Sequence, residues 1–268
     1  MTERTAPFPS ATDQRAAGTE ARTKVPASAH AGWVPATDRP DPVAVLAQQN
    51  LTREQDLVPV RHGRMMASPF TFYRGAAAIM AADLASTPAA GLQVQLCGDA
   101  HLSNFGLFGS PERRLVFDLN DFDETLPGPF EYDVKRMAAS FTIAARNNGF
   151  TKAQGRDITA ASVRAYREAM DAFARMSTME LWYAHLAETD IRTQLDQART
   201  STGDKHSKKT QKDKNGKSSK KPTAGEKAMS KAHTRDSLQA LSKLGEQVDG
   251  HYRIVHQPPV VIPAPLGQ

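Results

Sequence analysis

The chain has 268 residues, of which 40% are hydrophobic and 24% charged, a composition that excludes collagen, a coiled-coil rod and a wholly disordered chain. Its net charge of +5 comes from residues 199–235, which hold 12 Lys/Arg and 3 Asp/Glu, whereas the remainder holds 22 and 26. No apolar run approaches the roughly 18 to 20 residues of a membrane span, and no secretion signal is visible. The single cysteine, Cys97, cannot form an internal disulfide. These features predict a soluble, cytoplasmic protein.

The first third of the chain is predicted to begin with a long unfolded segment. Residues 1–45 are rich in Ala, Thr, Pro and charge, which predicts a disordered arm with local structure only near residues 40–46. Order is expected to begin near Arg53. An alanine-rich stretch predicts a helix over residues 73–86, and alternating apolar residues predict a half-buried strand over 92–99.

The middle of the chain alternates between strand and helix patterns. Two apolar runs, 105–108 and 115–119, flank a Gly/Ser/Pro turn and predict a β-hairpin. Residues 130–147 have a helical period, and a further helical stretch with interruptions runs from 151 to about 199. One face of this stretch collects five side chains that we expect in the core or against another helix: Val163, Tyr166, Met170, Phe173 and Met176.

The chain is therefore expected to hold one main folded region, residues 53–198. The lysine-rich residues 199–233 are predicted to be a low-complexity, solvated linker. A last helix is predicted over 226–247, followed by a strand-like, proline-rich segment. Residues 234–268 are interpreted as a helix and strand that begin an incomplete second part, so that we expect a truncated chain.

Most residues able to carry chemistry lie in the 27-residue window CGDAHLSNFGLFGSPERRLVFDLNDFD. Since the two ends of a hairpin reach one sheet edge, its polar side chains are expected to converge. Clustered carboxylates repel one another, and Mg²⁺ offsets this repulsion because it prefers carboxylate and amide oxygens. Each residue taken alone could instead cap a turn. The window contains Asp99, His101, Asn104, Asp118, Asp121 and Asp123.

The spacing of these residues is typical of phosphoryl transfer. There, an aspartate orients the attacking hydroxyl, an asparagine binds a metal, and an aspartate beyond a hairpin holds Mg²⁺ on the nucleotide phosphates. Asp99 and Asn104 are five residues apart, and Asp118 follows Asp99 by 19 residues.

GDAHLSN with its later aspartate resembles the catalytic core of aminoglycoside and choline phosphotransferases, relatives of protein kinases. PGPFEYDVKRMA is similar to the stretch that opens the next helix in that superfamily. The resemblance implies an α/β (α+β), protein-kinase-like fold, mostly the helical catalytic lobe with a short catalytic β-hairpin. It also implies ATP and Mg²⁺ as cofactors and phosphorylation of a hydroxyl on a small-molecule substrate.

The resemblance also implies roles for single residues. Asp99 matches the catalytic aspartate and Asn104 the first metal ligand. Asp118 matches the second metal ligand by spacing, and Asp121 matches it through the Asp-Phe pair of the kinase metal-binding turn, so both stay open.

Four further residues are expected to support the site. His101 would orient the loop, Asp133 would tie the next helix to it, and Asp123 belongs to the same acidic segment. Arg74, in FYRG, would either meet a phosphate or pair with an acidic residue, and the ion pair is favoured.

A closer resemblance is to a bacterial family of unknown function, domain family 2252. It is carried by VPVRHGRMMASPFTFYRGAAAIMAADLA, VQLCGDAHLSNFGLFGSPERRLVFDLNDFDET and PGPFEYDVKRMAASF, within residues 58–150. Kinase-like sites also need a glycine-rich loop and a strand lysine, and neither is visible before Asp99. The family resemblance implies that both follow beyond residue 268. The cofactor-binding residues are therefore unassigned, and the activity of this chain by itself stays open.

Other functions fit parts of the same pattern. One is a catalytically inactive kinase-like module that binds a nucleotide or a partner, and another is a metal-dependent phosphoesterase, which usually needs more paired histidines. With one cysteine, zinc is not favoured. The ten lysines within 205–231 could bind nucleic acid non-specifically, although a solvated insertion is the favoured interpretation. No membrane partner is expected.

Overall fold

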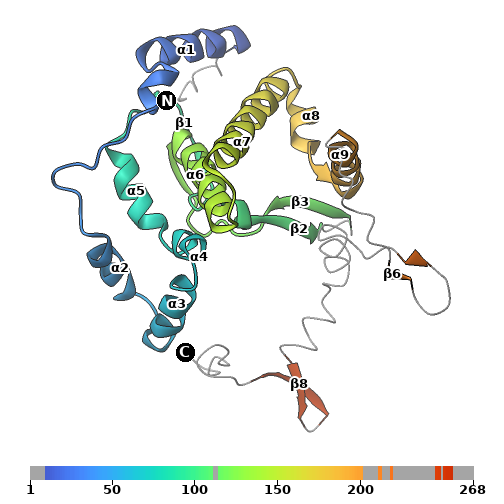
Figure 1. The fold of residues 1–268 in the computed structure, drawn as a ribbon. Coiled ribbons are helices and arrows are strands. Elements are labelled where there is room, and N and C mark those ends of the chain that lie inside the picture. The colour runs from blue at the N-terminus through green and yellow to red at the C-terminus, as the bar shows by residue number, and fades with distance from the viewer. Residues whose placement is uncertain are drawn as a thin grey trace, which may run out of the picture. The chain divides into compact units, whose positions relative to one another are not determined.

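The computed structural model describes residues 10–110, 114–201, 211–212, 218–219, 245–248 and 250–255. Within them the protein is mixed α/β: helices predominate, and the sheets are small and antiparallel (Figure 1). The chain forms two compact units, residues 1–102 with 122–168 and residues 103–121 with 169–268. In the described part of the chain, no helix is both long enough and apolar enough to span a membrane.

The first unit is mainly helical and has one two-stranded sheet. β1 and β4 pair antiparallel, from Gln93 opposite Pro129 to Leu96 opposite Leu126. The elements in chain order are α1 (Ala11–Lys24), η1 (Ala27–His30), α2 (Pro42–Asn50), η2 (Gln55–Leu57), α3 (Val58–Met65), α4 (Pro69–Arg74), α5 (Ala77–Ala85), β1 (Gln93–Leu96), β4 (Leu126–Pro129), α6 (Glu131–Asn147) and the greater part of α7 (Lys152–Phe173).

The core of this first unit contains polar as well as apolar side chains. Leu84, Leu96 and Met65 are buried there, but Arg136 is only 2% exposed and Ser140 is completely buried. Buried polar groups are costly unless they are hydrogen-bonded. The stability of this core therefore depends on the hydrogen-bond partners of Arg136 and Ser140.

The second unit begins with the hairpin that the sequence predicts. β2 and β3 pair antiparallel from Phe105 opposite Leu119 to Gly109 opposite Leu115, and β5 pairs with β3. The described elements are η3 (Leu102–Asn104), which starts at the boundary, β2 (Phe105–Gly109), β3 (Leu115–Leu119), α8 (Thr178–Tyr183), β5 (Leu186–Ala187), α9 (Glu188–Ser201), β6 (Gln211–Lys212), β7 (Ser218–Ser219), β8 (Gly245–Val248) and β9 (His251–Ile254).

The N-terminal arm differs from the sequence prediction of disorder. Residues 1–9 lie outside the described residues, but Ala11–Lys24 form helix α1. Its start is stabilised by a capping box, in which the Ser10 hydroxyl accepts from Asp13 N and Asp13 Oδ2 accepts from Ser10 N at 3.1 Å. Such caps satisfy orphan amides of the first turn, a local effect that the composition of the segment conceals.

The single helix predicted over residues 73–86 is two helices. α4 ends at Arg74 and α5 begins at Ala77. The break is at Gly75, where an added Cβ would lie 2.7 Å from both Cγ and Sδ of Met65. A larger residue at this position would therefore require the Met65 side chain to move.

The apolar stripe along residues 163–176 was predicted to lie in the core or against another helix, and the first of these is wrong for the described structure. Its five side chains are between 37% and 48% exposed. The helical period was interpreted correctly, since α7 covers most of the stripe. The described part of the chain does not bury this face.

Several predictions about the last third fall on residues 202–210, 213–217, 220–244 and 256–268, which lie outside the described residues. They include most of the linker and of the helix predicted over 226–247. The prediction that the helix continues to residue 247 is wrong, because Gly245–Val248 form strand β8. The predicted strand at His251 is confirmed by β9, which pairs with β8 around Gly250 at φ 78°.

Candidate functional site

The loop that carries Asp99 follows β1 and is tied to the start of α6. Asp133, in the first turn of α6, accepts hydrogen bonds from Cys97 N at 2.7 Å and from Gly98 N at 3.2 Å. Gly98 has φ +82°, and a Cβ there would overlap the carbonyl of Glu124. Only glycine fits this position, since the conformation is left-handed and the neighbouring backbone is close. The backbone just before Asp99 is therefore held by Asp133 on one side and by the Glu124 carbonyl on the other.

Asp99 forms a buried ion pair with Arg136 of α6. Nε of Arg136 donates to Asp99 Oδ1 at 2.6 Å, and Nη2 donates to the same oxygen. The side chain of Arg136 is 3% exposed and that of Asp99 is 14% exposed. A buried charge of this kind is tolerated only with an opposite charge and hydrogen bonds.

Tyr73 of α4 completes the surroundings of Arg136. The guanidinium carbon lies 4.6 Å from the centre of the Tyr73 ring, a cation–π contact. The two residues also exchange hydrogen bonds, since Nη2 of Arg136 donates to Tyr73 O at 3.2 Å and the Tyr73 hydroxyl donates to Arg136 O at 2.7 Å. Burial raises the pKa of Tyr73 to about 12 despite the charge of Arg136, so the phenol stays protonated.

His101 lies on the other side of the Asp99 carboxylate. Its Nε2 is 3.4 Å from Asp99 Oδ2, and its ring meets the Phe70 ring edge-on with centroids 6.4 Å apart. The side chain is buried, and among the described residues its Nδ1 has no hydrogen-bond partner. Ser140 holds the following residue, because its hydroxyl accepts from Leu102 N at 3.1 Å.

The charge state of Asp99 follows from these contacts. Burial by itself raises the pKa of the carboxyl group, but the hydrogen bond with His101 and the positive charge of Arg136 outweigh burial, so the pKa is lowered. Asp99 is therefore a carboxylate at neutral pH. Both of its oxygens have partners within the first unit, Oδ1 in Arg136 and Oδ2 in His101.

The predicted metal ligands lie in the second unit, at the open end of the hairpin. Asn104 is buried, and its Nδ2 donates to the main-chain oxygen of Asp121 at 2.7 Å. Its own carbonyl accepts from Asn120 N at 2.9 Å. The Asn120 side chain lies over Gly106, where an added Cβ would be 2.5 Å from Nδ2. The structure thus brings Asn104 and Asp121 together.

Asp118 lies in β3, opposite Gly106 of β2. It is exposed, and its Oδ1 accepts from Leu119 N at 2.7 Å. Asp123 is exposed in the turn before β4, within the first unit. Over the described ranges, no group of three or more His, Cys, Asp or Glu residues could hold a metal ion. A metal at the hairpin would therefore need other oxygen ligands besides carboxylates, such as an amide, water or phosphate.

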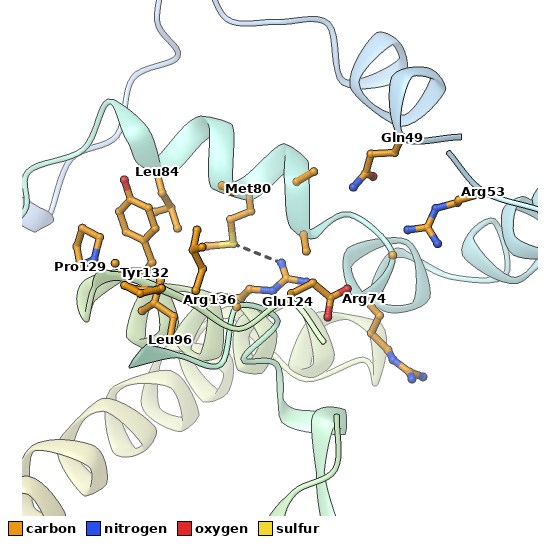
Figure 2. Close-up of a pocket in the computed structure, with 18 of the residues that line it drawn as sticks. Gln49, Arg53, Arg74, Met80, Leu84, Leu96, Glu124, Pro129, Tyr132 and Arg136 are labelled. Atoms are coloured by element: carbon orange, nitrogen blue, oxygen red, sulfur yellow. Dashed lines mark hydrogen bonds between the residues drawn. The ribbon is translucent and has the colours of Figure 1, made fainter. Parts of the chain in front are cut away.

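Arg74 has a different place from the one favoured by the sequence. The arginine that pairs with Asp99 is Arg136, whereas Arg74 forms no ion pair among the described residues. It lines a cavity of about 490 Å³ in the first unit, together with Arg53 and Arg61. Figure 2 shows Arg53 and Arg74 at one end and Leu84, Pro129 and Tyr132 at the other.

The sequence pattern singled out Arg74 but not Arg136, Tyr73 as its partner, or the cavity arginines Arg53 and Arg61. One signal was available for Arg136, which stands three residues after Asp133 and so lies near the same helix face. No comparable pattern identifies Arg53 or Arg61, because they come together only through the packing of separate helices.

The fold and the site define a mixed α/β protein with a carboxylate–guanidinium pair in its core. The chain belongs to the bacterial family DUF2252, described as "Uncharacterized protein conserved in bacteria", whose model matches residues 53–267. The family resemblance seen in the sequence is thereby confirmed, while the likeness to kinases stays a prediction. No curated protein and no solved structure matches the chain.

Proposed function

We propose that the protein is a kinase-like phosphotransferase that uses ATP and Mg²⁺ to phosphorylate a hydroxyl group of a small molecule. The observation that carries the proposal is the 2.7 Å hydrogen bond from Asn104 Nδ2 to Asp121 O. It joins two of the residues whose spacing matches a metal-binding phosphoryl-transfer site. The Asp133 contacts that hold the loop before Asp99 support the same interpretation.

The residues of the hairpin suit a hard cation. Asn104 would supply an amide oxygen, and Asp121 or Asp118 a carboxylate, all of which Mg²⁺ prefers. The contact with Asn104 favours Asp121. A bound Mg²⁺ would neutralise charge on the phosphates of the nucleotide.

Asp99 would act through its orientation and not as a strong base. Its lowered pKa keeps it ionised, and an ionised carboxylate can align the proton of a hydroxyl group. Arg136 and His101 would hold the carboxylate in position. We also propose that the protein works in the cytoplasm, where Cys97 stays reduced.

One observation favours a second candidate, a module that binds a nucleotide or a partner without chemistry. The Asp99 carboxylate contacts Arg136 through one oxygen and His101 through the other. A carboxylate engaged in this way can be purely structural, as buried ion pairs often are.

Titration calorimetry of the whole chain with ATP, with and without Mg²⁺, tests the proposal. We expect Mg²⁺-dependent binding that weakens about tenfold or more in Asp121→Ala, because a charged ligand of the metal is lost. Asp157→Ala, an exposed acid on α7, is the matched control and should bind as the parent does. Absence of Mg²⁺-dependent ATP binding would contradict both candidates that involve nucleotide.

A second measurement separates the enzyme from the module. For the enzyme, Asp99→Asn should abolish conversion of ATP to ADP and leave nucleotide affinity within about threefold, since the residue acts on the hydroxyl and not on the phosphates. A parent chain that binds Mg·ATP without turnover would favour the module.

A further inference from the structure

The cavity of the first unit gathers positive charge at one end. Arg53 follows α2, Arg61 lies in α3, and Arg74 ends α4. Among the described residues that line the cavity, Glu124 is the only acidic one. Over the described part of the chain, none of these three arginines is in an ion pair.

Arg61 is the least satisfied of the three. Its Nη2 donates to Gly75 O at 2.5 Å, but its Nη1 is buried and has no hydrogen-bond partner among the described residues. Burial, and then repulsion by Arg53, lowers the pKa of the guanidinium. Each effect disfavours the charged form of Arg61, and an anion between the arginines would offset both.

Arg136 also lines the cavity but is not available to a ligand. Its guanidinium is shared between Asp99, Tyr73 O and the sulfur of Met80, which lies 3.7 Å from Nη1. The contact with Met80 is drawn in Figure 2. The positive charge open to an anion is therefore that of Arg53, Arg61 and Arg74.

The other end of the cavity is apolar. Leu84, Leu96, Pro129 and Tyr132 lie there, away from Arg53 and Arg74 (Figure 2). The cavity volume of about 490 Å³ lies within the range of about 300 to 1,000 Å³ that is usual for small-molecule sites. An apolar wall with a few convergent polar groups is also typical of such sites.

We propose that this cavity binds a small organic anion, with a phosphate or carboxylate group on Arg53, Arg61 and Arg74 and an apolar or aromatic body against Leu84 and Tyr132. Arginine suits both anions because its donors match their oxygens in pairs. Gly98, next to Asp99 in the chain, also lines the cavity. The use of this anion as a phosphoryl acceptor rests on the proposed function, whereas the binding itself does not.

The test is calorimetry of the whole chain without Mg²⁺ or nucleotide, using phenyl phosphate, benzoate, benzyl alcohol and inorganic phosphate as separate ligands. We expect saturable binding of phenyl phosphate or benzoate, and the stronger of the two identifies the anion. Benzyl alcohol should not bind, and inorganic phosphate should bind at least tenfold more weakly than phenyl phosphate, since it lacks the apolar body.

Arg53→Ala and Arg74→Ala should each weaken that binding about tenfold, because each removes charge-assisted hydrogen bonds. Both side chains are exposed and form no ion pair among the described residues, so the variants should fold. Arg64→Ala is the matched control, an exposed arginine of α3 that does not line the cavity.

Three results would overturn the proposal. The first is no saturable binding of either organic anion. The second is an Arg53→Ala/Arg74→Ala double variant that binds as tightly as Arg64→Ala. The third is equal affinity for inorganic and phenyl phosphate, which removes the apolar part of the site. Because no Mg·ATP is present, failure here is distinct from failure of the proposed function, which is measured with Asp121→Ala.

Discussion

At the scale of single residues, the stability of the first unit depends on the charge of Arg136. Replacing Arg136 by Ala leaves the Asp99 carboxylate in the core without its cation, and we expect a loss of about 3–5 kcal/mol in the free energy of unfolding. Urea denaturation of the whole chain, followed by circular dichroism, measures the loss. Arg146→Ala, at an exposed position of the same helix, should change the free energy by less than about 0.5 kcal/mol.

A loss for Arg136→Ala as small as that for the Arg146 control would show that the carboxylate is protonated or solvated once its partner is gone. The ion pair would then contribute little to folding. Tyr73→Phe gives an independent check on the same cluster, because it removes the hydroxyl that donates to Arg136 O at 2.7 Å. It should cost about 1 kcal/mol, the usual value for one hydrogen bond.

The same carboxylate predicts a dependence of stability on pH. The pKa of Asp99 is lower in the folded protein than its ordinary value of 3.8, so its contribution is present above that value and is lost as pH falls through the folded pKa. Asp99→Asn lacks this contribution at every pH. The difference in unfolding free energy between the parent and Asp99→Asn should therefore be largest near neutral pH and shrink below pH about 4.

Urea titrations at a series of pH values from 7 to 3 follow this difference. A gap between the two proteins that stays constant over the series would mean that Asp99 has the same pKa folded and unfolded. Taking the difference also removes the effects of other carboxyl groups, such as Asp13, whose pKa is lowered by its hydrogen bonds with Ser10.

At the scale of elements, the loop after β1 is fixed by one glycine. Gly98 and Gly91 have nearly the same positive φ, +82° and +85°, but only Gly98 has backbone close to a new Cβ. Gly91→Ala should cost about 1–2 kcal/mol, the price of a left-handed alanine. Gly98→Ala adds a clash with the Glu124 carbonyl and should cost about 3 kcal/mol or more.

Thermal and urea unfolding of the two alanine variants measures this contrast. Similar losses of unfolding free energy for both variants would mean that the Glu124 backbone can move away from a Cβ at position 98 at little cost. The two positions have nearly the same φ, and only at Gly98 does the Glu124 carbonyl lie close to a new Cβ.

The elements themselves show how far sequence patterns reach in this protein. The hairpin of Phe105–Gly109 and Leu115–Leu119 is confirmed, because two short apolar runs around a Gly/Ser/Pro turn are a strong local signal. The helix over Glu131–Asn147 is also confirmed, because the helical period of its apolar residues is a local signal too. Helix α1 was not predicted, since its capping box lies in a segment whose composition indicates disorder.

Contacts between distant segments could not be predicted in the same way. Arg136 meets Tyr73 across 63 positions of the chain, and no local period indicates such a pair. The exposure of Met170 and its neighbours on α7 shows the opposite limit. A helical period indicates which face is apolar, but not whether the chain covers it.

At the scale of the whole molecule, charge is divided along the chain. The ten lysines of residues 205–231 stand in the basic segment, while the rest of the chain is acidic on balance. Most of these lysines lie outside the described residues. If these lysines meet DNA at all, their density predicts a weak affinity that does not depend on base sequence, because contacts with the phosphate backbone carry no sequence information.

Fluorescence anisotropy with a labelled duplex tests this prediction. The logarithm of the association constant should fall linearly with the logarithm of the salt concentration, and replacement of the ten lysines by glutamine should abolish binding. The Arg53→Ala/Arg74→Ala variant should keep its DNA affinity within about twofold, because two charges in a cavity contribute little to a phosphate backbone. An affinity insensitive to salt, or one lost with the two arginines, would place the contact with DNA elsewhere in the chain.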